Sequence, residues 1–124
     1  MNWPNFTREE FACQCGCGGN EVQDDLIDRL QRIRTRLKMP LRVTSGYRCP
    51  DHPIEAAKSK PGAHTTGLAA DIGIDRGEAF LFLSAALDEN FTGIGVNQKG
   101  EGRFIHVDLI PNRVNSPRPT IWSY

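Results

Sequence analysis

Three residues in this chain have types and surroundings that suit a metal site: His64, Asp71 and His106. His64 lies in an expected loop. Asp71 follows seven positions later inside an apolar run, residues 69–74, that is typical of a buried strand. An unpaired carboxylate there would be costly to bury, and a metal ion or a cationic partner would remove that cost. Two histidines and one carboxylate form a three-ligand site with an open fourth position, which is typical of catalytic zinc.

His106 lies in a short run that is itself expected to form a strand. Residues two apart in a strand share a face, so Phe104, His106 and Asp108 are predicted to point to one side and the residues between them to the other. His106 and Asp108 can therefore contribute to the same site. A zinc ion lowers the pKa of a water in its open position, so the chemistry that fits this pattern is metal-assisted hydrolysis.

Four cysteines form a second group of possible metal ligands. Cys13, Cys15 and Cys17 alternate with other residues, and Cys49 stands apart from them. Zinc sites usually contain a Cys-x-x-Cys pair, so this spacing is a weak metal signal. Three interpretations stay open: reduced structural thiols, a disulfide between Cys49 and one of the other three, and a second structural metal.

Hydrophobic spacing locates the helices that must support these sites. Apolar residues at positions 26, 30, 33 and 37 share one face of a helix predicted over residues 24–38, which Pro40 ends. A second long helix is predicted over residues 78–90, with an apolar stripe formed by Ala79, Leu83, Ala86 and Leu87. Shorter helical turns are expected over residues 5–10 and 51–58, and a loop over residues 59–62.

Four short strands are expected between and after these helices, over residues 41–44, 69–74, 93–96 and 104–109. The tail, residues 111–124, contains three prolines and is expected to run irregularly over the surface, with Trp122 tucking back. Helices and strands are mixed without regular alternation. This pattern predicts an α+β domain with a small, mainly antiparallel sheet that is flanked by helices.

Length and charge narrow the range of functions. A chain of 124 residues is expected to form one domain, residues 1–124, and we expect a monomer. Lys plus Arg equals Asp plus Glu, 15 against 15, so a nucleic-acid partner has no electrostatic support over the whole chain. No segment approaches the roughly 20 apolar residues of a membrane span. The first ten residues lack the pattern of a secretory signal, which predicts synthesis in the cytoplasm without a signal peptide.

Three motifs together resemble the M15 family of zinc peptidases. They are SGYRCP at residues 45–50, HTTGLAADI at residues 64–72 and FIHVD at residues 104–108. The match is most similar to the branch of D-Ala-D-Ala carboxypeptidases and phage endolysin-type peptidases. The resemblance implies an α+β fold shared with lysostaphin-type peptidases and the hedgehog signalling domain, and Zn²⁺ held by His64, Asp71 and His106.

The resemblance also implies a substrate and a residue that binds it. The substrate would be a peptidoglycan stem peptide, cut by a D-Ala-D-Ala carboxypeptidase or by an endolysin-type endopeptidase. Such an enzyme would act on the cell wall, and a phage-encoded one would be released by another protein. Arg48 would face the cleft and bind a substrate carboxylate or a developing oxyanion, the alternative being a loop-bracing arginine. His52 is expected to be a loop residue that makes local hydrogen bonds.

The sequence departs from this family at the position of the catalytic base. Relatives place an acidic residue three positions before the last histidine, where this chain has Arg103, and some have a histidine where this chain has Phe104. Asp108 and Glu101 are the candidates for the base, with a ligand-orienting residue and a solvated loop charge as their respective alternatives. The departure also leaves a second function open: a non-catalytic, zinc-containing cell-wall-binding module.

Overall fold

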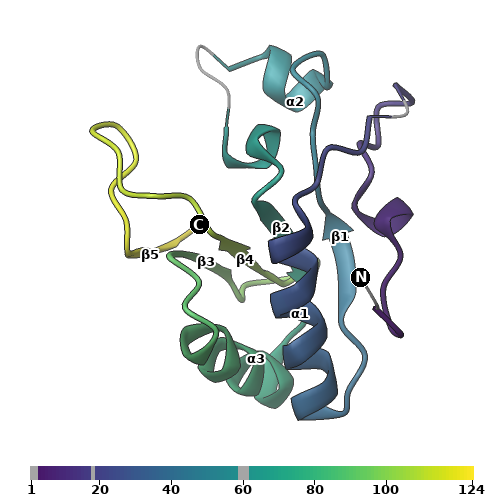
Figure 1. Ribbon diagram of the computed structural model, residues 1–124. Helices are drawn as coiled ribbons and strands as arrows, with labels where there is room; N and C mark the ends of the chain where they lie inside the picture. Colours follow the sequence, from purple (N-terminus) through teal and green to yellow (C-terminus); the bar gives the residue numbers. More distant parts are fainter. Residues whose placement is uncertain (1–2, 18, 59–61) are drawn as a thin grey trace.

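A computed structural model describes residues 3–17, 19–58 and 62–124. Five strands form a single mixed sheet in the order β1-β2-β4-β3-β5 (Figure 1). The strands are β1 (Arg42–Ser45), β2 (Ala69–Gly73), β3 (Gly93–Asn97), β4 (Phe104–Asp108) and β5 (Thr120–Ser123). The helices are η1 (Arg8–Phe11), α1 (Asp24–Leu37), α2 (Pro53–Ala56), η2 (Ala63–Thr66) and α3 (Arg76–Asp88). The predicted α+β class with a mainly antiparallel sheet is confirmed.

The register of the central strands brings the predicted ligands together. β2 and β4 pair antiparallel, and Asp71 lies directly opposite His106. On the other side of β4, Gly95 of β3 lies opposite the same histidine. Neighbouring residues in an antiparallel pair have their side chains within contact distance on one face. The sheet itself therefore places a carboxylate beside an imidazole.

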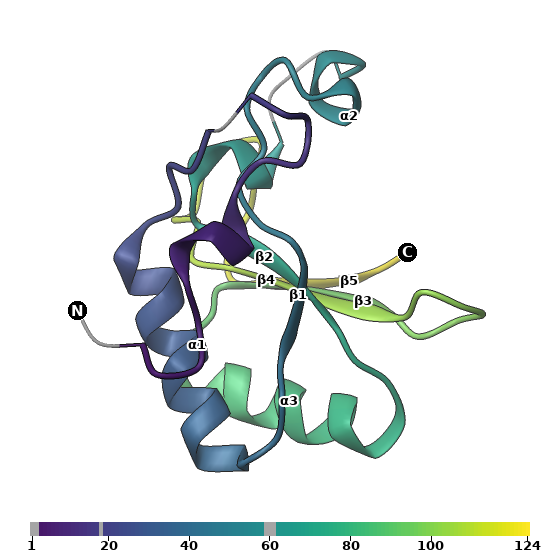
Figure 2. The same ribbon diagram turned by 90° about the vertical axis from the view of Figure 1, so that its right-hand side faces the viewer.

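The two faces of the sheet have different roles. The long helices α1 and α3 lie together on one side of the sheet (Figure 2), and Ile72, Ile105 and Val107 join their apolar residues in the core. Asp71 and His106 alternate with these core residues and therefore point to the opposite face. The alternation of side chains predicted for residues 104–108 is confirmed. It places apolar residues in the core and polar residues on the opposite face of the sheet.

The two long helices agree with the predicted ranges to within two residues, whereas the turn expected over residues 5–10 is η1 at residues 8–11, and one apolar stripe differs from its prediction. α1 buries Leu26, Leu30 and Ile33 as expected. In α3, Phe82 and Ala85 are buried, whereas Leu87 is 58% exposed. The buried face of α3 is therefore rotated about the helix axis relative to the predicted stripe, so that Leu87 lies outside it. The helix is apolar on most sides, and packing against the sheet selects the face that holds Phe82, whereas Phe80 is 73% exposed.

The tail differs most from its expected structure. β5 pairs in parallel with β3, so Trp122 lies opposite Gly95 instead of running irregularly. The outer edge of β3 offers free backbone groups, and pairing with residues 120–123 satisfies them. Trp122 does tuck back onto the body of the domain, as expected. The helix expected over residues 51–58 is shorter, being the single turn α2, and residues 59–61 of the expected loop fall outside the described part of the chain.

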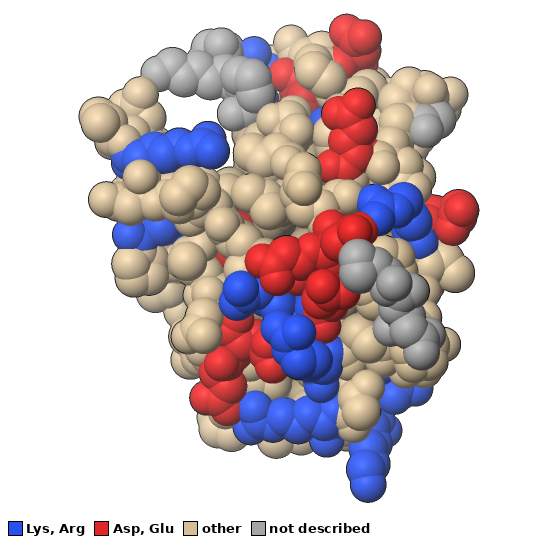
Figure 3. Space-filling view, viewed as in Figure 1, with Lys and Arg blue, Asp and Glu red and all other residues tan. Residues whose placement is uncertain are grey.

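The surface carries charges of both signs, as expected from equal numbers of basic and acidic residues. Positive and negative side chains are interspersed around α1 on the face shown in Figure 3. Several of them form ion pairs, such as Arg29 with Asp25 and Arg36 with Asp88. Within the described ranges, no helix has the length and apolar character that crossing a bilayer requires.

Candidate metal centre

His64 is held in one orientation by the backbone around it. It lies in the single turn η2, which ends at Gly67 with a left-handed φ of 75°. A side chain at Gly67 would collide with the Glu21 carbonyl, so only glycine fits this turn. The His64 Nδ1 lies 2.7 Å from the Gly46 carbonyl oxygen and donates to it. In the neutral ring this hydrogen bond leaves a lone pair on Nε2, which lies 3.4 Å from the Asp71 Oδ1.

His106 is oriented in the same manner by a carboxylate. Its Nε2 donates to the Asp108 Oδ2 at 2.8 Å, and its Nδ1 faces the Asp71 Oδ1 at 3.1 Å. The histidine is 2% exposed, and its ring lies 5.1 Å from the ring of His64 in an edge-on arrangement. Asp108 thus fixes the tautomer that leaves the Nδ1 lone pair directed at Asp71.

The donor set fits a metal ion. One atom each from His64, Asp71 and His106 can be chosen so that all three lie within 4.8 Å of one another. In the tautomers set by Gly46 and Asp108, all three are acceptors that face one point, and a cation there satisfies them together. Burial opposes charge on Asp71, but when protons rather than a metal lie between these groups, hydrogen bonds from His106 and His64 outweigh it and hold the pKa of Asp71 well below its usual range. The residues predicted as ligands are therefore brought together.

Asp108 lies behind His106 and away from the point where the ligand atoms meet. Its side chain is 0% exposed, and Arg118 donates to both carboxylate oxygens, from Nε at 2.9 Å and from Nη2 at 2.7 Å. Burial would raise the pKa of Asp108, but hydrogen bonds from His106 and Arg118 lower it to about 2. A carboxylate held in this way has no free oxygen for a substrate water. The geometry argues against Asp108 as the base and favours the ligand-orienting alternative.

Glu101, the other candidate base, is exposed in the turn between β3 and β4, which projects beyond the sheet in Figure 2. It does not line the cavity around the ligand atoms. His52 accepts a hydrogen bond from the Ile54 backbone N–H at 3.1 Å and caps α2, which is the local contact expected of it. Arg103 hydrogen bonds to the Gly100 carbonyl within the same β-turn region.

The ligand atoms open into a cavity of about 250 Å³. Besides the three ligands, it is lined by Arg48, Lys58, Ala63, Phe104, Trp122 and Tyr124. Arg48 therefore faces the cleft, as the sequence motif implied. Its guanidinium lies 3.3 Å from the buried Glu55 carboxylate, which also accepts from Lys58 at 2.9 Å and from the Gly62 N–H at 2.8 Å. Burial opposes ionisation of Glu55, but these donors lower its pKa.

The comparison with protein families agrees with this geometry. A family model described as Peptidase M15 matches residues 4–108. The chain belongs to the peptidase M15 family. M15 peptidases are metalloenzymes, so the chain is a metallopeptidase-type enzyme. Its candidate metal site lies on the face of the sheet opposite α1 and α3. A comparison with curated proteins finds no significant match.

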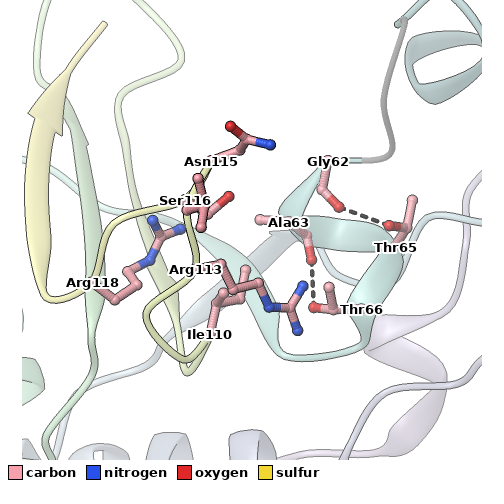
Figure 4. Close-up of a pocket in the computed structure, with 10 residues that line it drawn as sticks. Gly62, Ala63, Thr65, Thr66, Ile110, Arg113, Asn115, Ser116 and Arg118 are labelled. Carbon is pink, nitrogen blue, oxygen red and sulfur yellow. Dashed lines mark hydrogen bonds between the residues drawn. The ribbon is translucent and has the colours of Figure 1, made fainter.

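A larger cavity of about 560 Å³ adjoins the first one in this M15 domain. Ala63 lines both, and Figure 4 shows η2 on one side of the larger cavity with the segment between β4 and β5 on the other. Arg113 extends across it towards Thr66, and Arg118 lies at its other end. The two cavities of this M15 domain therefore lie next to each other, with Ala63 between them and the two arginines on the far side of the larger one.

Sequence reasoning missed several residues of the cleft. Lys58, Glu55 and Arg118 were not singled out. Residues 120–124 carry no period-two pattern that would predict β5, which brings the Trp122 ring within 5.2 Å of the His106 ring and the Tyr124 ring within 5.1 Å of the Phe104 ring. No local pattern marks Arg118 or Glu55, since their roles depend on contacts between distant segments.

Proposed function

We propose that this M15 domain is a zinc-dependent peptidase that hydrolyses an amide bond in bacterial peptidoglycan stem peptides. The observation that carries the proposal is the convergence of His64, Asp71 and His106 at one end of a cleft that also contains Arg48. Three ligands with an open fourth position are typical of catalytic zinc. Bound zinc would polarise a scissile carbonyl and lower the pKa of a water molecule.

The residues of the chain supply position and charge around that chemistry. His64 and His106 are held by Gly46 and Asp108, so little reorganisation is needed when a cation binds. Arg48 presents a guanidinium to the cavity, and Glu55 fixes it there. A fixed guanidinium suits a planar carboxylate, which a stem peptide that is not cross-linked carries at its C-terminus. Arg48 is therefore proposed to anchor the substrate.

The size of the cleft supports an extended peptide. The cavity at the metal centre and the larger one beside it meet at Ala63, so a bound chain could occupy both. Arg113 in the second cavity is exposed and suits an acidic side chain of a stem peptide. Space for an extended chain suits an endolysin-type endopeptidase, and a terminal carboxylate at Arg48 suits a D-Ala-D-Ala carboxypeptidase, so both activities stay within the proposal.

One observation supports the alternative function, a non-catalytic module that binds the cell wall. Among the described residues that line the metal-site cavity, the only carboxylate is Asp71, which is itself a candidate ligand. A non-catalytic, zinc-containing cell-wall-binding module would have this composition. Asp108 and Glu101 remain the predicted bases, although the structure brings neither into the cavity.

Synthetic stem peptides with D-residues, and matched all-L peptides, test the proposed substrate. The zinc-loaded protein is expected to cleave the first and not the second, and removal of zinc by a chelator is expected to stop cleavage. Mass spectrometry of the products identifies the bond. Tight binding of the stem peptide without any cleavage would favour the binding module. Equal cleavage of both peptides would contradict specificity for peptidoglycan.

The same proposal extends to where the enzyme acts. We propose a monomer that acts on the cell wall, as a phage-type enzyme released by another protein. Expression in bacteria with a fused export signal is expected to cause lysis, and expression without it is expected to leave cells intact. Secretion of the unfused protein would contradict this proposal.

A further inference from the structure

The four cysteines, which are far apart in sequence, meet at one point. The Sγ atoms of Cys13, Cys15 and Cys49 lie 3.3–3.6 Å from one another, and Cys17 Sγ lies within 4.8 Å of all of them. The cluster lies where the N-terminal segment runs beside the chain that leaves β1 (Figures 1 and 2). It is separate from the histidine centre, with which it shares no residue.

These spacings match a tetrahedral metal site. Zinc–sulfur bonds of about 2.3 Å place the sulfurs at the corners of a tetrahedron with edges of about 3.8 Å. A disulfide would draw one pair to about 2.0 Å and leave the other sulfurs outside bonding distance. Here three sulfurs are nearly equidistant, and all four cysteines are free.

The backbone is arranged to support thiolates at this point. Gly16 adopts a φ of 91°, which lets Cys15 and Cys17 turn towards the same centre. The Cys49 N–H donates to Cys13 Sγ at 3.3 Å, and the Gly19 N–H donates to Cys17 Sγ at 3.2 Å. N–H donors to sulfur are the outer partners that stabilise thiolate ligands around a metal.

We propose that Cys13, Cys15, Cys17 and Cys49 bind a structural Zn²⁺ ion. With four thiolates the coordination shell is closed, so this ion has no open position for a substrate. Zinc binding displaces the thiol protons to solvent, and the thiolates carry the charge that holds the ion. Of the three interpretations that the cysteine spacing left open, the geometry selects the second metal.

The position of this site gives it a role in shaping the catalytic cleft. Cys49 directly follows Arg48, whose backbone N–H donates to the His64 carbonyl at 3.1 Å. Gly46, three residues before Cys49, accepts from the His64 ring and packs so closely on Phe11 that a Cβ would lie 2.6 Å from its backbone. The structural ion would therefore fasten the N-terminal segment to the loop that carries both Arg48 and the carbonyl that orients His64.

Metal counting on the full chain, purified under reducing conditions without chelator, tests this proposal. Elemental analysis is expected to find about two zinc ions per chain and no iron. Adding a mercurial reagent that modifies thiols is expected to release about one of them, in step with modification of the four cysteines. The zinc released with thiol modification comes from the cysteines alone and needs no variant and no peptidase activity, so its failure is distinguishable from failure of the proposed function.

Variants separate the two sites. C15S/C17S is expected to keep only the zinc at the histidine centre, and H106A only the zinc at the cysteine centre. Gln14→Ala, which removes a side chain between two of the cysteines without removing a thiol, is expected to keep both. H106A loaded with Co²⁺ is expected to show thiolate-to-cobalt charge-transfer absorption. Thiols that are modified without metal release, an intact mass lighter by two or four hydrogens, or iron in place of zinc would overturn the proposal.

Discussion

The two histidines that could hold the catalytic metal are each fixed by a hydrogen-bond partner on the ring nitrogen that faces away from Asp71. Gly46 accepts from His64, and Asp108 accepts from His106 and is in turn held by Arg118. Each partner selects the tautomer that leaves a lone pair facing Asp71. The tautomers would be unfavourable without a cation at the point where the lone pairs meet. The site therefore consists of the ligands together with the hydrogen-bond partners that orient them.

Asp71→Asn tests the ligand assignment most directly at this scale. The amide keeps the size of the side chain but removes the negative charge that two imidazoles face. We expect zinc affinity to fall by more than the 10–100-fold loss that is typical when an outer partner is removed. Equilibrium competition with a chromophoric chelator measures it. Unchanged affinity in this variant would show that the metal lies elsewhere.

Asp108→Asn distinguishes an orienting residue from a base. If Asp108 orients His106, zinc affinity should fall by about 10–100-fold, and excess zinc should restore the activity. A lost base would leave the enzyme inactive even when it is saturated with zinc. Glu101→Ala is the matched variant for the other candidate, and full activity in both variants would remove both residues from the role of base.

Arg48 is expected to act on substrate binding. Arg48→Ala removes the cation that faces the cleft, and we expect KM to rise by about 10-fold or more with a smaller change in kcat, because a charged hydrogen bond contributes about 1.5–3 kcal/mol. Arg48→Lys should recover only part of this loss, since lysine cannot bind a carboxylate through two parallel donors. A rise in KM that the lysine variant fully reverses would contradict bidentate binding.

At the scale of elements, the strands that carry the ligands could be predicted and the strand that covers them could not. The alternation of residues 104–108 is a local signal, and the sheet confirms it. β5 depends on pairing with an edge of β3 that is more than 20 residues distant, and its prolines suggest an irregular segment. The sequence left two roles open for Asp108, and only its contact with Arg118 favours the orienting one; the contact of Glu55 with Arg48 has no local signal.

Two glycine substitutions give a matched pair at this scale. In β3, a Cβ on Gly93 would lie 2.3 Å from the Asp108 Oδ1, and that carboxylate is fixed by several donors. We expect Gly93→Ala to lower the free energy of unfolding by about 1–3 kcal/mol and to weaken zinc binding. Gly77→Ala in α3 meets nothing within 4 Å and should be neutral or stabilising by up to about 1 kcal/mol. Urea unfolding measures both, and equal effects would contradict the proposed contact.

For the whole molecule, metal and protons are expected to compete for the same site. Burial disfavours charge on His106, but hydrogen bonds to Asp108 and Asp71 raise its pKa above the ordinary 6.5. A raised pKa in the folded state stabilises the fold below about pH 6.5, and this contribution is lost as the pH rises through the folded value. Asp71 and Asp108 have lowered pKa values, so their contribution is present above about pH 3.8 and is lost as the pH falls further.

The chelated protein is therefore expected to be most stable between about pH 4 and 6.5 and to weaken towards pH 9. Zinc should remove the weakening at alkaline pH, because it replaces the proton between His106 and Asp71. Thermal unfolding across this range, with and without zinc, measures the effect. A chelated protein whose stability increased above pH 7 would contradict this prediction.

Digestion of purified peptidoglycan tests the central claim most directly. The zinc-loaded protein, the chelated protein, the chelated protein with zinc restored, and Asp71→Asn are incubated with the same cell-wall preparation, and released fragments are identified by mass spectrometry. We predict peptide fragments with the first and third samples and none with the other two. A zinc-loaded protein that binds the wall but releases no fragment, or fragments that persist in Asp71→Asn without metal, would contradict a zinc peptidase centred on His64, Asp71 and His106.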